Sequence, residues 1–129
     1  MAWVDIVGML AVVQLFVFGV LVARARGTYG VAAPATTGHP MFERYYRVQV
    51  NTVECLIVFL PALWLAAYFW NPRWASILGA VWLAARIWYA RAYVRDPGSR
   101  SGGFGLSFMA VIVLLIGAAI GWARGFVAA

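Results

Sequence analysis

Two sets of polar side chains recur at helical spacing inside long apolar segments, and both suit the binding of a charged ligand. Arg47, Asn51 and Glu54 are spaced i, i+4, i+7, so they share one face of a helix. The second set is spaced i, i+3, i+7, also shares one face, and comprises Arg86, Tyr89 and Tyr93. Guanidinium groups bind carboxylates, and a carboxylate binds an ammonium group. Together these groups suit a small zwitterion that carries extra carboxylates.

The two sets match in depth if their helices run antiparallel. Depth is counted inward from the helix ends at about 1.5 Å per residue. Arg47 and Tyr93 both lie about 3 Å deep, Asn51 and Tyr89 about 9 Å, and Glu54 and Arg86 about 13 Å. An unpaired charge near the bilayer centre costs at least about 2.5–3.5 kcal/mol. We therefore expect a structural ion pair between Glu54 and Arg86. Binding of a ligand cation by Glu54 is an equally open interpretation.

The composition is that of a membrane protein. Of the 129 residues, 65% are hydrophobic, and the mean hydropathy is +0.86, whereas soluble domains are about half apolar. All ten basic residues are arginine, and the net charge of +6 indicates arginines at membrane edges or in a site, not a nucleic-acid surface. One histidine, His39, and one cysteine, Cys55, indicate no metal site and no intrachain disulfide.

Four segments are long and apolar enough to cross a bilayer core of about 30 Å. They span approximately residues 3–23, 45–70, 72–95 and 105–122. Asn71 and Pro72 suit the N-cap and first position of the third helix. The first segment is too long for a signal peptide and lacks a basic region before it. We expect one domain over residues 1–129, an all-α integral membrane protein with an antiparallel bundle of four transmembrane helices.

Most of the arginines lie beside the first and third connections. Arg73 and Arg124 alone flank the opposite side, whereas the arginines near these two connections are Arg24, Arg26, Arg44, Arg47, Arg91, Arg95 and Arg100. The positive-inside rule then predicts cytoplasmic connections and outward termini. We expect a multi-pass protein of a bacterial inner membrane. The two polar sets would form the walls of a cleft that opens to the cytoplasm.

Two motifs carry a resemblance to a known family. PATTGHPMFERYYRVQVNTVE, residues 34–54, resembles the MAPEG family, the membrane-associated proteins in eicosanoid and glutathione metabolism, and has every fixed position of its FER-x-x-R-x-Q-x-N-x-x-E run. ARIWYARAYVRDPGSR, residues 85–100, is similar to the family's third-helix pattern of an arginine, two spaced tyrosines and a later arginine. The resemblance covers essentially the whole chain and is to members of the microsomal glutathione transferase type.

The resemblance implies a homotrimer that binds glutathione, as a co-substrate, between neighbouring subunits. It implies that one subunit contacts glutathione through Arg47, Asn51, Glu54, Tyr89 and Tyr93. The neighbouring subunit would supply Arg26 and Gln49, and Arg100 would be the catalytic group that stabilises the glutathione thiolate. Two positions depart from the family pattern: Cys55 stands where several members have tyrosine, and Gly27 where some have a second arginine.

These expectations lead to a functional hypothesis with two alternatives. The leading hypothesis is a membrane-embedded glutathione transferase of the detoxification type, whose thiolate attacks small hydrophobic electrophiles, with peroxide reduction as a further activity. The first alternative is a non-catalytic relative that binds a lipid or a thiol in the membrane. The second is a small cation exporter built around Glu54, which the arginine-rich mouth of the cleft disfavours.

Overall fold

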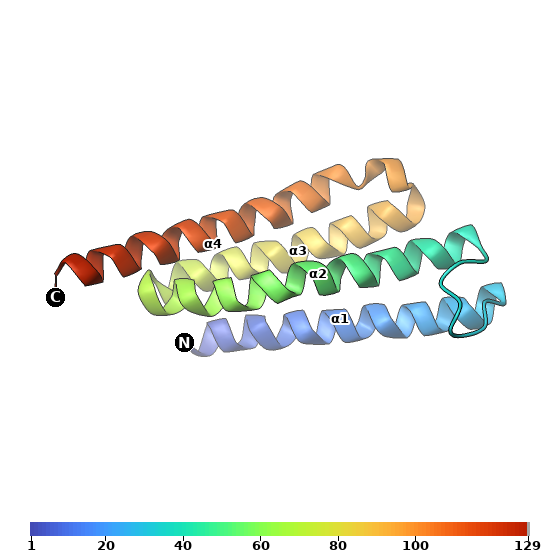
Figure 1. Ribbon diagram of the computed structural model, residues 1–129, viewed down its shortest axis with the longest axis horizontal. Helices are drawn as coiled ribbons and strands as arrows, with labels where there is room; N and C mark the ends of the chain where they lie inside the picture. Colours follow the sequence, from blue (N-terminus) through green and yellow to red (C-terminus); the bar gives the residue numbers. More distant parts are fainter. Residues whose placement is uncertain (129) are drawn as a thin grey trace.

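A computed structural model describes residues 1–128 as four long α-helices and one short 3₁₀ helix. The elements are α1 (Ala2–Tyr29), α2 (Pro40–Phe69), α3 (Pro72–Arg95), η1 (Pro97–Ser99) and α4 (Ser101–Val127). The four long helices lie side by side, and both termini are at the same end of the molecule (Figure 1). The fold is therefore all-helical, as predicted.

The two middle helices, α2 and α3, hold the bundle together. They pack against each other, and each contacts α1 on one side and α4 on the other (Figure 1). At the centre, the rings of Phe59 and Trp82 stack with their centroids 3.9 Å apart, and both side chains are fully buried. Polar side chains of α2 and α3 line hollows between the helices.

Helices α1, α2 and α4 begin before the apolar ranges predicted from the sequence, whereas α3 coincides with its predicted range. Helix α2 begins at Pro40, because the Nδ1 atom of His39 accepts a hydrogen bond from the Met41 amide at 3.2 Å. Helix α3 begins as predicted, with Asn71 Oδ1 accepting from the amides of Arg73 and Trp74. Apolar length indicates how much of a helix lies in hydrocarbon, whereas capping groups decide where the helix begins and ends.

Three segments are long and apolar enough to cross a membrane: α1, α2 and the stretch Pro97–Val127 that contains α4. Among the described residues, α3 is not one of them, since it carries four arginines. Large apolar side chains are exposed along α1 and α4, for example Phe16 at 72% and Phe108 at 57%. Such outward-facing apolar surface suits contact with lipid chains.

Close packing at Gly103 sets the position of α4 against α3. A Cβ atom at Gly103 would lie 2.5 Å from the amide nitrogen of Tyr89, whereas a Cβ atom at Gly105 would meet nothing within 4 Å. We expect Gly103→Ala to destabilise the protein by about 1–3 kcal/mol, because the backbone of α3 cannot move aside cheaply. Gly105→Ala is the matched control on the same helix and should be neutral or slightly stabilising. Thermal unfolding in detergent would compare them, and equal midpoints would contradict this packing role.

Candidate functional site

A polar cleft opens between α2, α3 and the start of α4. Its volume is about 570 Å³, and its lining includes five of the side chains that the sequence indicated as a site: Arg47, Asn51, Tyr89, Tyr93 and Arg100. Gly98, Ser101 and Phe104 complete the wall. Two residues from each of the two sets predicted from spacing therefore meet in one hollow, and Arg100 of the third connection lines the same hollow.

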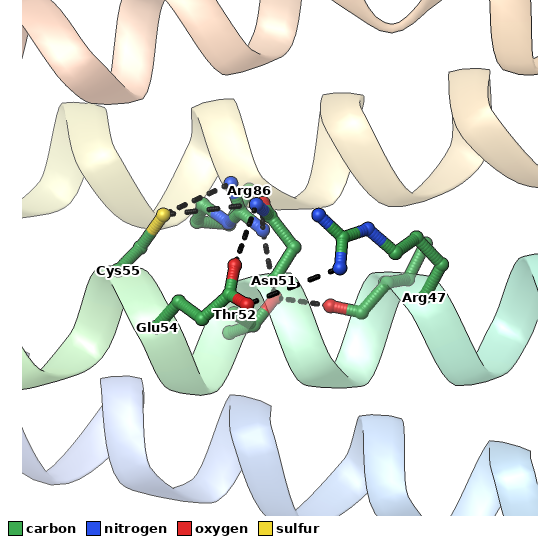
Figure 2. A network of polar contacts seen from close by, with 7 residues as sticks. Arg47, Asn51, Thr52, Glu54, Cys55 and Arg86 are labelled. Atoms are coloured by element: carbon green, nitrogen blue, oxygen red, sulfur yellow. Dashed lines mark hydrogen bonds and ion pairs between the residues drawn. The ribbon is translucent and has the colours of Figure 1, made fainter.

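Arg86 lies behind this cleft, fully buried between α3 and α2. Its guanidinium donates to Asn51 Oδ1 and to Thr52 Oγ1, each at 2.8 Å, and lies 3.9 Å from Cys55 Sγ (Figure 2). The guanidinium carbon also sits 4.2 Å from the centroid of the Tyr89 ring, within range of a cation–π interaction. Neutral acceptors and an aromatic face thus surround this cation.

The expected ion pair between Glu54 and Arg86 is wrong. Glu54 instead approaches Arg47, two turns earlier on α2, at 3.9 Å, and both side chains are about half exposed, at 55% and 51% (Figure 2). Depth alone had suggested the pairing with Arg86. The rotation of α2, however, turns Asn51 and Thr52 toward α3, and Glu54 lies about 60° around the helix from Asn51.

Glu54 lines a second hollow that adjoins the cleft. This hollow has a volume of about 260 Å³ and shares Asn51 and Phe104 with the cleft. The amide nitrogen of Asn51 donates to Glu54 Oε2 at 3.5 Å, while the oxygen of the same amide accepts from Arg86. Asn51 therefore links the buried guanidinium of Arg86 to the exposed carboxylate of Glu54.

The two tyrosines form an aromatic wall. Tyr89 is 2% exposed, and its ring centroid lies 5.7 Å from that of Tyr93, which is nearer the mouth of the cleft. Phe104 of α4 adds a third ring, 6.3 Å from Tyr89. This wall provides apolar surface beside charged groups, which suits a ligand that has both apolar and charged parts.

Arg100 stands at the mouth of the cleft on a structured turn. Asp96 caps η1 by accepting from the Gly98 amide at 3.0 Å, and Arg100 follows directly as the residue before α4. The side chain is exposed, and its one hydrogen bond is a long contact of 3.4 Å to the carbonyl of Pro97. Its guanidinium can therefore turn toward a ligand at little cost.

Arg26 and Gln49 lie away from this cleft. Arg26 donates to the carbonyl of Ala35 and lies over the ring of Phe42, at 4.7 Å from its centroid. The side chain of Gln49 packs beside Gly19 of α1 and lines a separate hollow between α1 and α2. Within one chain, therefore, neither residue joins the other site residues.

Two participants escaped the sequence interpretation. Thr52 binds Arg86, and its sequence signal was available, since it is a polar residue next to Asn51 in an apolar helix. Phe104 gave no signal, because one more aromatic residue in an apolar segment is ordinary. No group of three or more His, Cys, Asp or Glu that could hold a metal occurs within residues 1–128.

Comparison with known proteins decides the family. Residues 5–120 match the model of the MAPEG family. The chain belongs to the MAPEG family. With three apolar helices as well, it is a membrane protein. The predicted resemblance is thus confirmed over nearly the whole chain.

Several relatives of this MAPEG protein align over most of their length. Microsomal glutathione S-transferase 2 from Homo sapiens is 36% identical over 120 residues, which cover 93% of this chain and 82% of the relative. Leukotriene C4 synthase from Bos taurus is 37% identical over 123 residues, 95% and 82% of the two chains. An uncharacterized protein from Synechocystis sp. is 45% identical over 116 residues, 90% and 85%.

Proposed function

We propose that this protein is a membrane-embedded glutathione transferase that binds glutathione in the cleft between α2, α3 and α4. The observation that carries the proposal is the meeting of Arg47, Asn51, Tyr89, Tyr93 and Arg100 in one cleft, with Glu54 beside it. Two relatives are, by name, a glutathione S-transferase and leukotriene C4 synthase. Family membership and cleft chemistry thus support the same class of activity.

The charges of the cleft complement those of glutathione. Glutathione carries two carboxylates and one ammonium group, and its thiol adds a third negative charge when ionised. Arg47 is placed to bind a carboxylate, and Glu54, whose side chain is 55% exposed, can accept from the ammonium group. The Tyr89–Tyr93 wall would then lie beside the peptide backbone of glutathione.

The chemical step needs a thiolate and a place for the electrophile. Arg100 would stand against the sulfur, where its positive charge favours the thiolate over the thiol. The thiolate attacks an electrophilic carbon, forms the carbon–sulfur bond and releases the leaving group with its electron pair. A hydrophobic electrophile would arrive from the surrounding lipid, and a peroxide oxygen is a second possible target of the same thiolate.

The proposed functional unit is a homotrimer in which four helices of each subunit span the membrane. Arg26 and Gln49 lie off the cleft of their own chain, and an adjacent subunit would bring them to it. Helix α3 would cross with the others, since it lies alongside them and its buried Arg86 donates to Asn51 and Thr52 inside the bundle (Figure 1). We place the cleft on the cytoplasmic side of a bacterial inner membrane, with both termini outside.

Glu54→Gln should weaken glutathione binding about 10- to 100-fold, because the amide cannot form the ion pair with the ligand ammonium group. Glu43→Gln is the matched control on the same helix, since Glu43 faces the loop at Gly38 and a glutamine oxygen can still accept from that amide. Titration calorimetry in detergent would measure both dissociation constants. Equal affinities for the two variants would remove Glu54 from the binding site.

Turnover tests the proposed function as a whole. Purified protein in detergent should conjugate glutathione to chlorodinitrobenzene, and glutathione should raise its unfolding temperature. Stabilisation without turnover of any electrophile or peroxide would favour a non-catalytic binding protein. Cys55 supports that second candidate, because its thiol points toward Arg86, where several family members have a tyrosine. The absence of both turnover and stabilisation would contradict the proposal.

A further inference from the structure

A groove larger than the polar cleft lies between α1, α2 and α3. Its volume is about 700 Å³, and its lining residues are Phe18, Leu21, Met41, Arg44, Tyr45, Val48, Ile87, Ala90, Arg91, Val94 and Arg95. It shares none of these residues with the polar cleft or with the hollow at Glu54. The proposed glutathione chemistry therefore leaves this groove without a role.

The groove is cationic at one end and apolar along its length. Three arginines line it, no acidic residue does, and Arg91 and Arg95 are exposed one helical turn apart on α3. From Arg95 inward to Ile87, the apolar floor runs over eight residues, or about 12 Å. That length covers most of one leaflet of a hydrocarbon core about 30 Å thick.

Arg44 removes the obstacle that a helix end would present to an anion. The carboxyl end of a helix carries partial negative charge on its free carbonyls and repels anions. Here the Nη1 atom of Arg44 donates to the carbonyls of Val94 and Arg95, at 2.9 and 3.1 Å. The guanidinium of Arg44 thus offsets the negative partial charge at the end of α3. Arg91 and Arg95 can therefore attract an anion there.

We propose that this groove binds one anionic phospholipid of the surrounding membrane, with the phosphate at Arg91 and Arg95 and an acyl chain along the floor. The charge of the rim matches a headgroup with net negative charge, and a zwitterionic headgroup lacks that net charge. Ile87 on the floor is 46% exposed, and such outward-facing apolar surface suits contact with an acyl chain. This inference does not depend on the proposed function, because it uses none of the proposed glutathione contacts.

Native mass spectrometry of protein extracted from vesicles with equal phosphatidylglycerol and phosphatidylcholine would test the proposal. The wild-type chain should retain one phosphatidylglycerol per chain in clear preference to phosphatidylcholine. Arg91→Gln with Arg95→Gln should lower that preference about 25-fold, at about fivefold per arginine. Arg73→Gln with Arg124→Gln, at the opposite end of the bundle, is the matched control and should leave it unchanged.

A second variant tests the floor of the groove separately. Ala90→Leu should displace the acyl chain and lower retention of both lipids, whereas Ala84→Leu, at an exposed position of α3 outside the groove, should not. Equal retention of both lipids by the wild type, or an unchanged preference in the double arginine variant, would overturn the proposal. Displacement of the retained phospholipid by free fatty acid, added at an equal concentration, would also overturn the proposal.

Discussion

Arg100→Ala is expected to lower kcat for glutathione conjugation about 100- to 1000-fold, the usual loss when one group that stabilises a developing or bound anion is removed. The dissociation constant of glutathione should change much less, because the other charged contacts of the proposed site remain. Stability should be unaffected, since Arg100 is exposed and makes one long hydrogen bond of 3.4 Å. Steady-state kinetics and titration calorimetry would measure these effects separately.

A pH profile separates this role from simple electrostatic attraction. In the proposed mechanism, the guanidinium of Arg100 lowers the pKa of the bound glutathione thiol, so the wild type should hold the thiolate at neutral pH. In Arg100→Ala the pKa of that thiol should return toward about 8.5. Activity should then rise with pH, and the thiolate absorbance near 240 nm should be lost at pH 7. Arg124→Ala is the control, and an unchanged profile in Arg100→Ala would exclude thiolate stabilisation by Arg100.

Arg86→Ala should destabilise the protein by about 2–5 kcal/mol, because it opens a cavity at a fully buried site between α2 and α3. Arg86→Met should be close to neutral in stability, since replacing a buried charge with an apolar chain of similar volume removes its desolvation cost. In both variants Asn51 loses the donor that orients its amide. We therefore expect glutathione affinity to fall about tenfold in both.

Unfolding in detergent, followed by calorimetry with glutathione, would separate the stability effect from the binding effect. Arg73→Ala, at the exposed start of α3, is the control and should change neither quantity by much. Loss of stability in Arg86→Met equal to that in Arg86→Ala would mean that the charge itself, and not its volume, holds α2 to α3. Unchanged affinity in both variants would show that Arg86 does not position Asn51.

The polar cleft and the groove proposed to bind lipid share no lining residue, so their variants should act independently. The cleft opens between α2, α3 and the start of α4, whereas the groove lies between α1, α2 and α3. Substitutions at distant sites without shared partners usually have additive effects. A combined Arg100→Ala and Arg91→Gln, Arg95→Gln variant should therefore show the kinetic loss of the first and the lipid loss of the second.

Much of the site was open to prediction because it depends on spacing along single helices. Arg47 and Asn51 share a helix face at any rotation of α2, and Tyr89 and Tyr93 do so on α3. Antiparallel order then brings the two faces to matching depths, since depth is a count of residues from the helix end. The structure confirms that these four side chains line one cleft.

The tertiary structure alone decided which side chain meets Arg86. Glu54 and Asn51 differ by three residues in depth but by about 60° in direction, and helix rotation is set by packing around residues such as Phe59 and Trp82. That packing turned the amide of Asn51 toward the buried guanidinium of Arg86 and left the carboxylate of Glu54 in the second hollow. The sequence alone thus determined the family, the all-helical class and the residues of the cleft. Side-chain packing determined which residues these side chains contact, because the rotation of each helix depends on contacts between distant parts of the chain.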